Sequence, residues 1–344
     1  IMPVKRLVWL SLLLTTVIWA AFSWPLPRYV ATGVPSSSTN SDKGQVRSMI
    51  MGDHLQLVYS YWIFADMLSG KTRFFHNLYE FNTGNDDERR YVGFDFMPYT
   101  LVFTLAYWIG ERAFAWNVTG LISLWLTLSV MWLLLRNYTR NDIHAGAMAL
   151  VSIAMPYLWA MSMGGSPTGY SMAFVPMLLW GIDTGVRRGK VIGGAVAGLS
   201  FICAFLNDAH VLLFSLLLAP CWALFVALHA SEEPFWNKRR WVRMFLGLLP
   251  FALIVLFLVS LIQMGKGEVA ETTIEHGFNM SEVAAHSPHL RGLTAWRSVG
   301  VSSIIYLGYV LPMLLLAGVV AQLWKAIRAP REEWRRTAAL LCIM

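Results

Sequence analysis

The sequence predicts an all-α, polytopic transmembrane helix bundle of about nine or ten membrane segments. Of its 344 residues, 56% are hydrophobic and only 14% are charged, whereas about a quarter of the residues of a soluble domain are charged. The apolar residues fall in blocks of about 18 to 25, the length of helix that crosses about 30 Å of hydrocarbon. Trp and Tyr gather at the ends of these blocks, where amphipathic rings prefer the headgroup layer. These three observations exclude a soluble fold.

The first apolar block, residues 7–24, follows Lys5 and Arg6. Positive residues stay on the cytoplasmic side of a span, so this helix is expected to start in the cytoplasm and to end outside. A cleaved signal peptide would give a similar pattern, but no clear small-x-small cleavage site follows the block. The polar stretch 25–96 is therefore expected to form a large external loop.

Two apolar pieces, 97–109 and 113–135, precede a basic run that contains Arg136 and Arg140. The first piece has about 13 residues, which is short against the roughly 17 to 25 of a span, and Pro98 stands near its start. It is expected to be re-entrant or to lie on the membrane surface, so that the two pieces make a single crossing. Two full crossings are the alternative, but they would place Arg136 and Arg140 outside, against the charge rule.

The remaining apolar blocks alternate across the membrane in agreement with their flanking charges. The expected spans are 145–162, 171–185, 191–206, 211–228, 244–263 and 302–327. The basic runs placed in the cytoplasm are 186–190, 229–243 and 328–336. A second external segment is expected at 264–298. The chain is interpreted as one membrane domain, 1–344, and its last residues, inside a new apolar run, predict a longer protein.

Composition and motifs exclude several classes of protein. The net charge of +7 does not indicate nucleic-acid binding, because Lys and Arg stand in short runs beside apolar blocks. The cysteines Cys203, Cys221 and Cys342 lie inside apolar segments, without the spacing of a disulfide framework or a zinc site. No G-x-S-x-G, P-loop, HExxH or CxxC motif supports a soluble hydrolase, a nucleotide-driven motor or a structural zinc protein. The Gly193-Gly194 pair predicts close helix packing instead of a phosphate-binding loop.

The external loop 25–96 holds an unusual share of the acidic residues. They are Asp42, Asp53, Asp66, Glu80, Asp86, Asp87, Glu88 and Asp95. The centre of the loop reads Gly52-Asp53-His54-Leu55-Gln56, and the aromatic amphipathic run that follows predicts a helix along the membrane surface. Asp53 could simply cap that helix by accepting backbone N–H bonds. An acid at the mouth of a membrane cavity can also act as a base or bind a cation.

The order of motifs along the chain is informative. A first helix leads into a large loop opening with Gly52-Asp53, and an aromatic helix ending at Gly70 follows. A Pro-containing segment, Met97-Pro98-Tyr99, and a helix start, Ala115-Trp116-Asn117, come next. In this order the features resemble the GT-C superfamily of membrane glycosyltransferases, which take sugars from polyprenyl-phosphate carriers. The resemblance covers most of 52–220 through short motifs, and it lacks the paired Pro-Pro expected after the loop.

The resemblance implies roles for particular residues. It makes Asp53 the catalytic base or a carboxylate that holds a divalent cation such as Mg²⁺ or Mn²⁺. It also implies a second external carboxylate, for which Asp208 in the turn 207–210 is the candidate. Asp208 has a structural alternative, because a four-residue turn needs Asn and Asp to satisfy backbone groups. The residues assigned to substrate binding are His54, Gln56, Lys71, Arg73, Asp95, His210 and Arg291.

The predicted function is transfer of a sugar from a polyprenyl-phosphate carrier to a glycan, lipid or protein acceptor at the external face of the membrane. The expected setting is a bacterial inner membrane, with membrane lipid and the lipid-linked donor as partners and no nucleic acid. A transporter or flippase is the rival class, although its spans should carry ionisable groups at mid-depth and broken helices in matching halves. A non-catalytic assembly protein is the third alternative.

Overall fold

The computed structural model describes residues 2–35, 53–74, 96–139, 141–163, 167–229, 237–266 and 309–343. Within these ranges every regular element is a helix. Four helices are long and apolar enough to cross a membrane, namely α1 (Val4–Phe22), α4 (Arg112–Leu135), α10 (Ala209–His229) and α11 (Lys238–Lys266). The predicted all-α class is confirmed for these residues, and the four helices are candidates for the predicted membrane spans. Within the described ranges, fewer helices reach spanning length than the predicted count of about nine or ten membrane segments.

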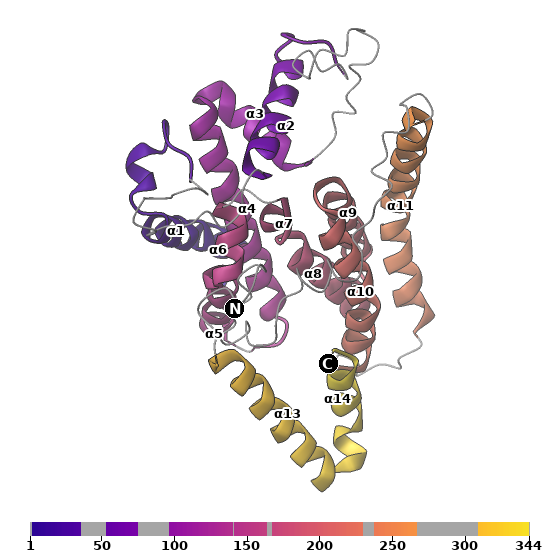
Figure 1. Ribbon diagram of the computed structural model, residues 1–344. Coiled ribbons are helices and arrows are strands. Elements are labelled where there is room, and N and C mark those ends of the chain that lie inside the picture. Colours follow the sequence, from indigo (N-terminus) through magenta and orange to yellow (C-terminus); the bar gives the residue numbers. More distant parts are fainter. Residues whose placement is uncertain are drawn as a thin grey trace, which may run out of the picture.

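Shorter helices complete the described part of the chain. They are η1 (Leu26–Tyr29), α2 (Asp53–Leu68), α3 (Tyr99–Ile109), α5 (Asp142–Ala154), α6 (Pro156–Met163), α7 (Pro167–Ser171), α8 (Phe174–Arg188), α9 (Val191–Asn207), α13 (Val310–Arg328) and α14 (Pro330–Ile343). α4 contacts α1, α3, α5 and α8, and α9 packs against both α8 and α11. α13 and α14 form a hairpin that points away from the bundle, and α14 packs on α10 (Figure 1).

The predicted span 145–162 is divided into two helices, α5 with 13 residues and α6 with 8. Met155 between them is extended, with φ −65° and ψ 129°. Pro156 explains the break, because proline disfavours a helical conformation in the residue before it and suits the first position of a helix. Neither piece reaches the roughly 20 residues that cross hydrocarbon. The prediction of one continuous span is therefore wrong.

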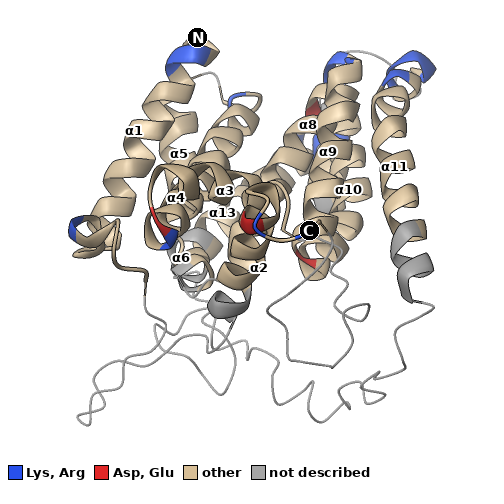
Figure 2. Ribbon diagram, turned by 90° about the horizontal axis from the view of Figure 1, so that it is seen from above, with Lys and Arg blue, Asp and Glu red and all other residues tan. Residues whose placement is uncertain are grey.

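One end of the bundle, here named the basic end, collects positively charged helix ends. Arg136, just after α4, donates to the Met2 carbonyl at 2.8 Å and pairs with Asp142 of α5 at 2.8 Å. Arg188, the last residue of α8, donates to Asn137 Oδ1 at 3.1 Å. Figure 2 shows Lys and Arg along this edge, from the start of α1 to the start of α11. The basic ends of α1, α4, α8 and α11, which the charge rule assigned to one side, thus lie at one end of the bundle. The run 328–336 lies instead in the α13–α14 hairpin that points away from the bundle.

A buried ion pair lies at the basic end. The Asp183 carboxylate of α8 is fully buried and accepts bonds from Arg187 Nε at 2.9 Å and Nη2 at 3.1 Å. Asn137 Nδ2 donates to it at 2.9 Å, and the Tyr138 hydroxyl donates as well. Burial, and then the Asp183 carboxylate, raise the pKa of Tyr138, so that its hydroxyl keeps the proton it donates. This network ties the α4–α5 turn to α8.

The opposite end, here named the loop end, carries α3 and the turn between α9 and α10. The Phe96 N–H donates to the Leu206 carbonyl, near the end of α9, at 2.7 Å. α3 has 11 residues, a length of about 16 Å, and its last residue, Ile109, stands just before α4. Asn117, in the first turns of α4, donates to the Gly33 carbonyl at 2.7 Å. α3 is thus shorter than a span, as predicted, and it packs along α4.

Close backbone contacts join α9 to its neighbours. A Cβ at Gly193 would overlap the backbone of Gly185 in α8, and a Cβ at Gly194 would overlap the Met244 carbonyl oxygen in α11. A Cβ at Gly247 of α11 would overlap backbone atoms of α9 in the same way. At each of these glycines, backbone atoms of the neighbouring helix lie where a side chain would otherwise be. Small residues allow helices to approach closely in membranes in this way. The predicted packing role of Gly193-Gly194 is confirmed.

Gly194→Ala is expected to lower the free energy of unfolding by about 1–3 kcal/mol, the usual cost of overpacking a tight site. The reason is that the Met244 carbonyl can move aside only if α11 moves with it. Gly318→Ala in α13 is the matched control, because nothing lies within 4 Å of its Cβ position. Thermal unfolding in one detergent compares the two variants. Equal stability of Gly194→Ala and the unchanged protein would contradict the close approach of α9 and α11.

A cysteine at position 188 is expected to react only from the cytoplasm, and a cysteine at position 210 only from outside. Arg188 and His210 are both exposed and lie at opposite ends of the bundle, and the charge rule assigns the basic end to the cytoplasm. A membrane-impermeant maleimide, applied to intact and to lysed cells, measures this in a background without Cys221 and Cys342. The reverse labelling pattern would invert the proposed orientation.

Candidate functional site at the loop end

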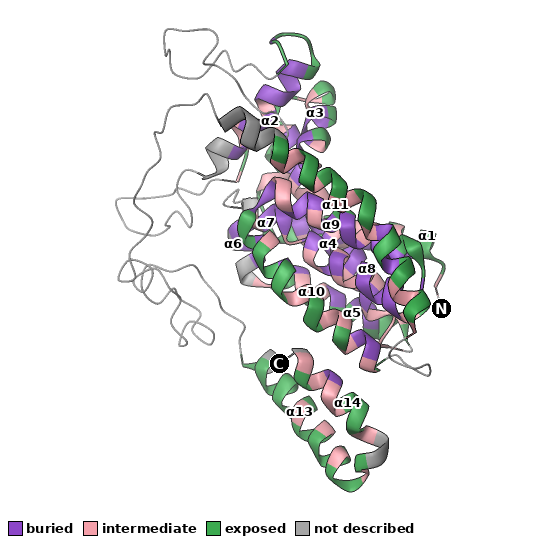
Figure 3. Cartoon of the chain, turned by 90° about the vertical axis from the view of Figure 1, so that its right-hand side faces the viewer, coloured by how far each residue is buried: buried purple, intermediate pink, exposed green. Residues whose placement is uncertain are grey.

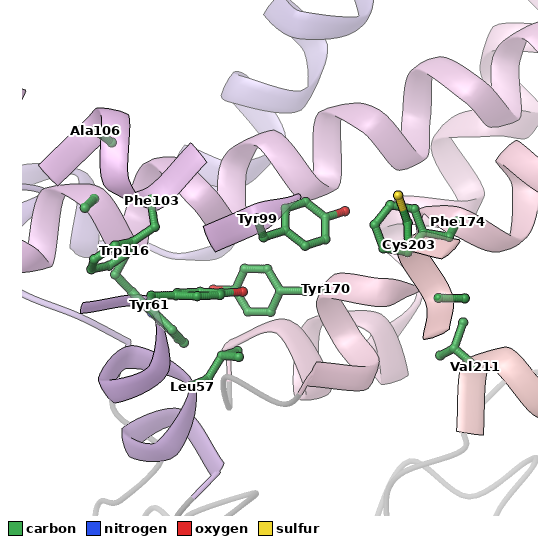
Figure 4. Packing of buried hydrophobic residues seen from close by; sticks show 12 residues of the cluster. Leu57, Tyr61, Tyr99, Phe103, Ala106, Trp116, Tyr170, Phe174, Cys203 and Val211 are labelled. Carbon is green, nitrogen blue, oxygen red and sulfur yellow. The ribbon is translucent and has the colours of Figure 1, made fainter. Parts of the chain in front are cut away.

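A cluster of buried aromatic residues fastens the helices at the loop end (Figure 4). Tyr99 of α3 lies against Tyr170 of α7, with ring centroids 5.8 Å apart. Tyr170 also contacts Trp116 of α4 at 5.4 Å, and Tyr61 of α2 contacts Phe103 of α3 at 5.3 Å. Such tilted and edge contacts add to the gain from burying the rings. The cluster holds α2, α3, α4 and α7 in one arrangement around the α9–α10 turn.

The turn between α9 and α10 is fixed by its first residue. Asn207 ends α9, and its side-chain amide donates to the Cys203 carbonyl at 2.7 Å and to the Met97 carbonyl. The second bond reaches the residue two positions before α3. Asp208 follows with an extended backbone, φ −159° and ψ 118°, so the chain can reverse into α10. The turn therefore also positions the start of α3.

The Asp208 carboxylate joins α7 to α10. Its Oδ2 accepts a bond from the Thr168 hydroxyl of α7, and its Oδ1 accepts the backbone N–H of His210 at 2.7 Å. Oδ1 also lies 3.1 Å from His210 Nδ1. Asp208 is only 9% exposed, whereas the His210 side chain is 83% exposed. A buried carboxylate thus meets an imidazole that faces outward.

The geometry of Asp208 agrees with a structural role in the turn, and it also contains contacts that such a role does not need. The bond from the His210 N–H is the one that an Asp in a turn makes with the backbone two residues later, as the structural alternative predicted. The contacts with Thr168 and the His210 ring go beyond that requirement. When Nδ1 donates to the carboxylate, Nε2 carries the free lone pair on the exposed side of the ring. Such a group can accept a proton or a hydrogen bond from a ligand.

α2 starts at the same end of the bundle. Asp53 is its first residue, close to the predicted helix start, and Leu57 one turn later packs in the same aromatic cluster as Val211 of α10. Residues 57–67 of α2 are buried or half-buried, so this part of the helix lacks the exposed face of the predicted surface helix. Val211 follows His210 directly. The side chains of Asp53, His54 and Gln56 lie outside the described residues, so only the helix that carries them is placed. Asp95 and Arg291 also lie outside the described residues.

Lys71 and Arg73, assigned to substrate binding, follow α2. Lys71 Nζ lies 3.3 Å from the buried Asp66 carboxylate and 5.7 Å from the centre of the Tyr107 ring. A buried carboxylate needs a partner, so Lys71 has a structural role beside Asp66. A bound phosphate would have to contact an ammonium group that is already paired with this carboxylate. Arg73 is exposed. Sequence analysis assigned Lys71 to substrate binding and did not predict its pairing with Asp66.

In the described part of the chain, no three His, Cys, Asp or Glu side chains gather as a metal ion would require.

Thr168 is the site residue that sequence analysis missed. A threonine 40 positions from its partner carries no local signal, and only the packing of α7 against α9 and α10 brings it to Asp208.

Comparisons of the chain with protein-family models, curated proteins and solved structures gave no match. The resemblance to GT-C transferases therefore rests on the order of features in the sequence.

Proposed function

We propose that the protein transfers a sugar from a polyprenyl-phosphate carrier to an acceptor hydroxyl at the loop end, which faces the outside of a bacterial inner membrane. The observation that supports this proposal most directly is the Asp208 carboxylate, buried at the loop end and bonded to Thr168 and His210. It provides a second acidic group at the end of the bundle where α2 begins with Asp53.

The proposed reaction divides the work between two carboxylates. The acceptor oxygen attacks the anomeric carbon, the bond from that carbon to the phosphate oxygen breaks, and the carrier phosphate leaves. Asp53 accepts the acceptor proton or holds a divalent cation, and Asp208 with His210 binds hydroxyl groups of the substrates. Arg73 and Arg291 are the basic residues proposed for the phosphate, which favours guanidinium groups.

A lipid-linked donor suits this architecture. Its tail can stay in the bilayer beside the helices while its sugar reaches the loop end from the side. Holding donor and acceptor together then converts a bimolecular reaction into one within a complex, which is a large part of catalysis for such transfers. The spanning helices would bind the tail, and the loop end would supply the polar groups.

The experiment is a transfer assay with the full chain reconstituted in liposomes. Radiolabelled polyprenyl-phosphate sugars, hexose and pentose in turn, are supplied with a membrane-lipid extract as acceptor. The expected result is movement of label from the carrier to a new product. Movement of the intact donor between leaflets, without a new product, would replace the proposal with a flippase. If neither occurs with any donor, the transferase proposal is wrong.

A further inference from the structure

The turn between α8 and α9 packs against the start of α11. Gly189 ends α8 in the left-handed conformation, with φ 59°. Arg240 of α11 lies against this glycine, because its Cγ would be only 3.1 Å from a Cβ at position 189. Two basic runs that are separate in the sequence therefore form one surface at the basic end (Figure 2), here named the basic patch. Its exposed members are Arg188, Lys190, Lys238, Arg239 and Arg243.

The basic patch carries positive charge that the protein itself does not neutralise. The neighbouring Arg187 is paired with Asp183 inside the bundle. By contrast, no acidic side chain in the described ranges forms an ion pair with any of the five exposed members. Arg239 and Arg243 stand four positions apart on α11, a spacing at which like charges repel. An anion bound at the patch would relieve this repulsion.

Exposed apolar residues border the basic patch on both α9 and α11. Ile192 follows Lys190 by two positions and is 58% exposed, and Phe245 follows Arg243 by two positions and is 59% exposed. At 1.5 Å per residue, the apolar surface begins about 3 Å from the cations along each helix. Figure 3 looks onto α11 and shows that much of this helix is exposed. The exposed apolar set is Val191, Ile192, Val242, Phe245 and Leu246.

The combination of cations and apolar surface selects the kind of ligand. A molecule that covers both must carry negative charge at one end of an apolar body. A phospholipid with net negative charge has this form, whereas inorganic phosphate and nucleic acid have no apolar part. A zwitterionic phospholipid offers less, because its own ammonium group offsets the charge of its phosphate.

We propose that the basic patch binds the phosphate groups of anionic phospholipid, with the acyl chains along the exposed apolar residues of α9 and α11. Arg can contact phosphate oxygens with two N–H donors, and Lys adds a compact charge. Basic surfaces where spanning helices leave the membrane recognise anionic headgroups through these contacts. The cations come from α8, α11 and the start of α9, so a bound lipid would join these helices and stabilise the fold. This proposal does not depend on sugar transfer.

The test measures the unfolding temperature of the purified full chain in detergent micelles with equal amounts of phosphatidylglycerol or phosphatidylcholine. The patch variant is Arg239→Gln/Arg243→Gln. The matched control is Arg28→Gln/Arg112→Gln, which removes the same charge from two exposed arginines outside the patch. Glycerol phosphate replaces the lipid in a further arm, because it has the charge of the headgroup without acyl chains.

Phosphatidylglycerol is expected to raise the unfolding temperature of the unchanged protein and of the control by about 5 °C, as a nearly saturating ligand does. The patch variant should lose most of this rise, and high salt should weaken it. No rise with phosphatidylglycerol, or the same rise with phosphatidylcholine, would overturn the proposal. An undiminished rise in the patch variant, or an equal loss in the control, would place lipid binding elsewhere. An equal rise with glycerol phosphate would show a site for a soluble anion instead of a lipid.

Discussion

Asp53→Asn is expected to lower the rate of sugar transfer by about 100- to 10,000-fold, the usual contribution of a general base. Asp53 begins α2 at the loop end, and its carboxylate would accept the proton of the acceptor hydroxyl. Asparagine has nearly the same size and keeps much of the capacity to cap a helix, but it cannot take up the proton. The measurement is turnover of the polyprenyl-linked donor by purified variants in liposomes.

The same series separates catalysis from helix capping. If Asp53 only caps α2, Asp53→Ala costs about 1 kcal/mol of stability and leaves the chemistry intact. Asp86→Asn and Asp87→Asn are the controls, because these acids stand in a polar cluster typical of a solvated turn, and both variants should keep full activity. Asp208→Asn should rank second in loss of activity. Full activity in well-folded Asp53→Asn would end the catalytic role of Asp53.

Asp183→Ala is expected to lower the free energy of unfolding by about 3 kcal/mol, near the lower limit for removing one partner of a buried ion pair. The substitution leaves the Arg187 guanidinium, Asn137 and the Tyr138 hydroxyl without their shared acceptor. The loss stays near the lower limit because the Arg187 side chain is 22% exposed and can be partly rehydrated. Thermal unfolding followed by size-exclusion chromatography measures the effect.

Arg188→Ala provides the matched control for Asp183→Ala. Arg188 is the next residue in α8, is exposed and makes one bond to Asn137. Its removal is expected to cost at most about 1 kcal/mol, as for other exposed polar contacts. If Asp183→Ala destabilises the protein no more than Arg188→Ala does, the buried network does not hold the α4–α5 turn on α8.

Several features of the fold could be predicted from single stretches of sequence. The short apolar piece 97–109 predicted a helix shorter than a span, and α3 has 11 residues. Pro156 carried the signal for the break between α5 and α6, but the apolar run around it outweighed that signal in the prediction. The mistake has a physical origin. Hydropathy indicates whether a segment is surrounded by lipid or by water, whereas proline indicates where the backbone leaves the helical conformation.

The candidate site could be predicted only in part. Gly52-Asp53 and the aromatic run located the start of a helix, and α2 begins at Asp53. The bond from Thr168 to Asp208, the pairing of Lys71 with Asp66 and the network around Asp183 carried no signal in the local pattern. Each depends on which residues the packing of helices brings together, and for Thr168 that partner is 40 positions away.

The sequence by itself predicted a helical membrane protein with its positively charged helix ends on one side, and the structure is helical in its described residues, with four helices long and apolar enough to cross a membrane. The free energy of transfer from water to lipid depends on the hydropathy of each segment, and its orientation depends on the flanking charges. Both properties can be read from a local stretch of sequence. Only the tertiary structure decided which carboxylates are buried, which have partners, and that Asp208 meets Thr168 and His210. A side chain in a membrane bundle acquires its environment from neighbouring helices, and that environment exists only after the helices have packed.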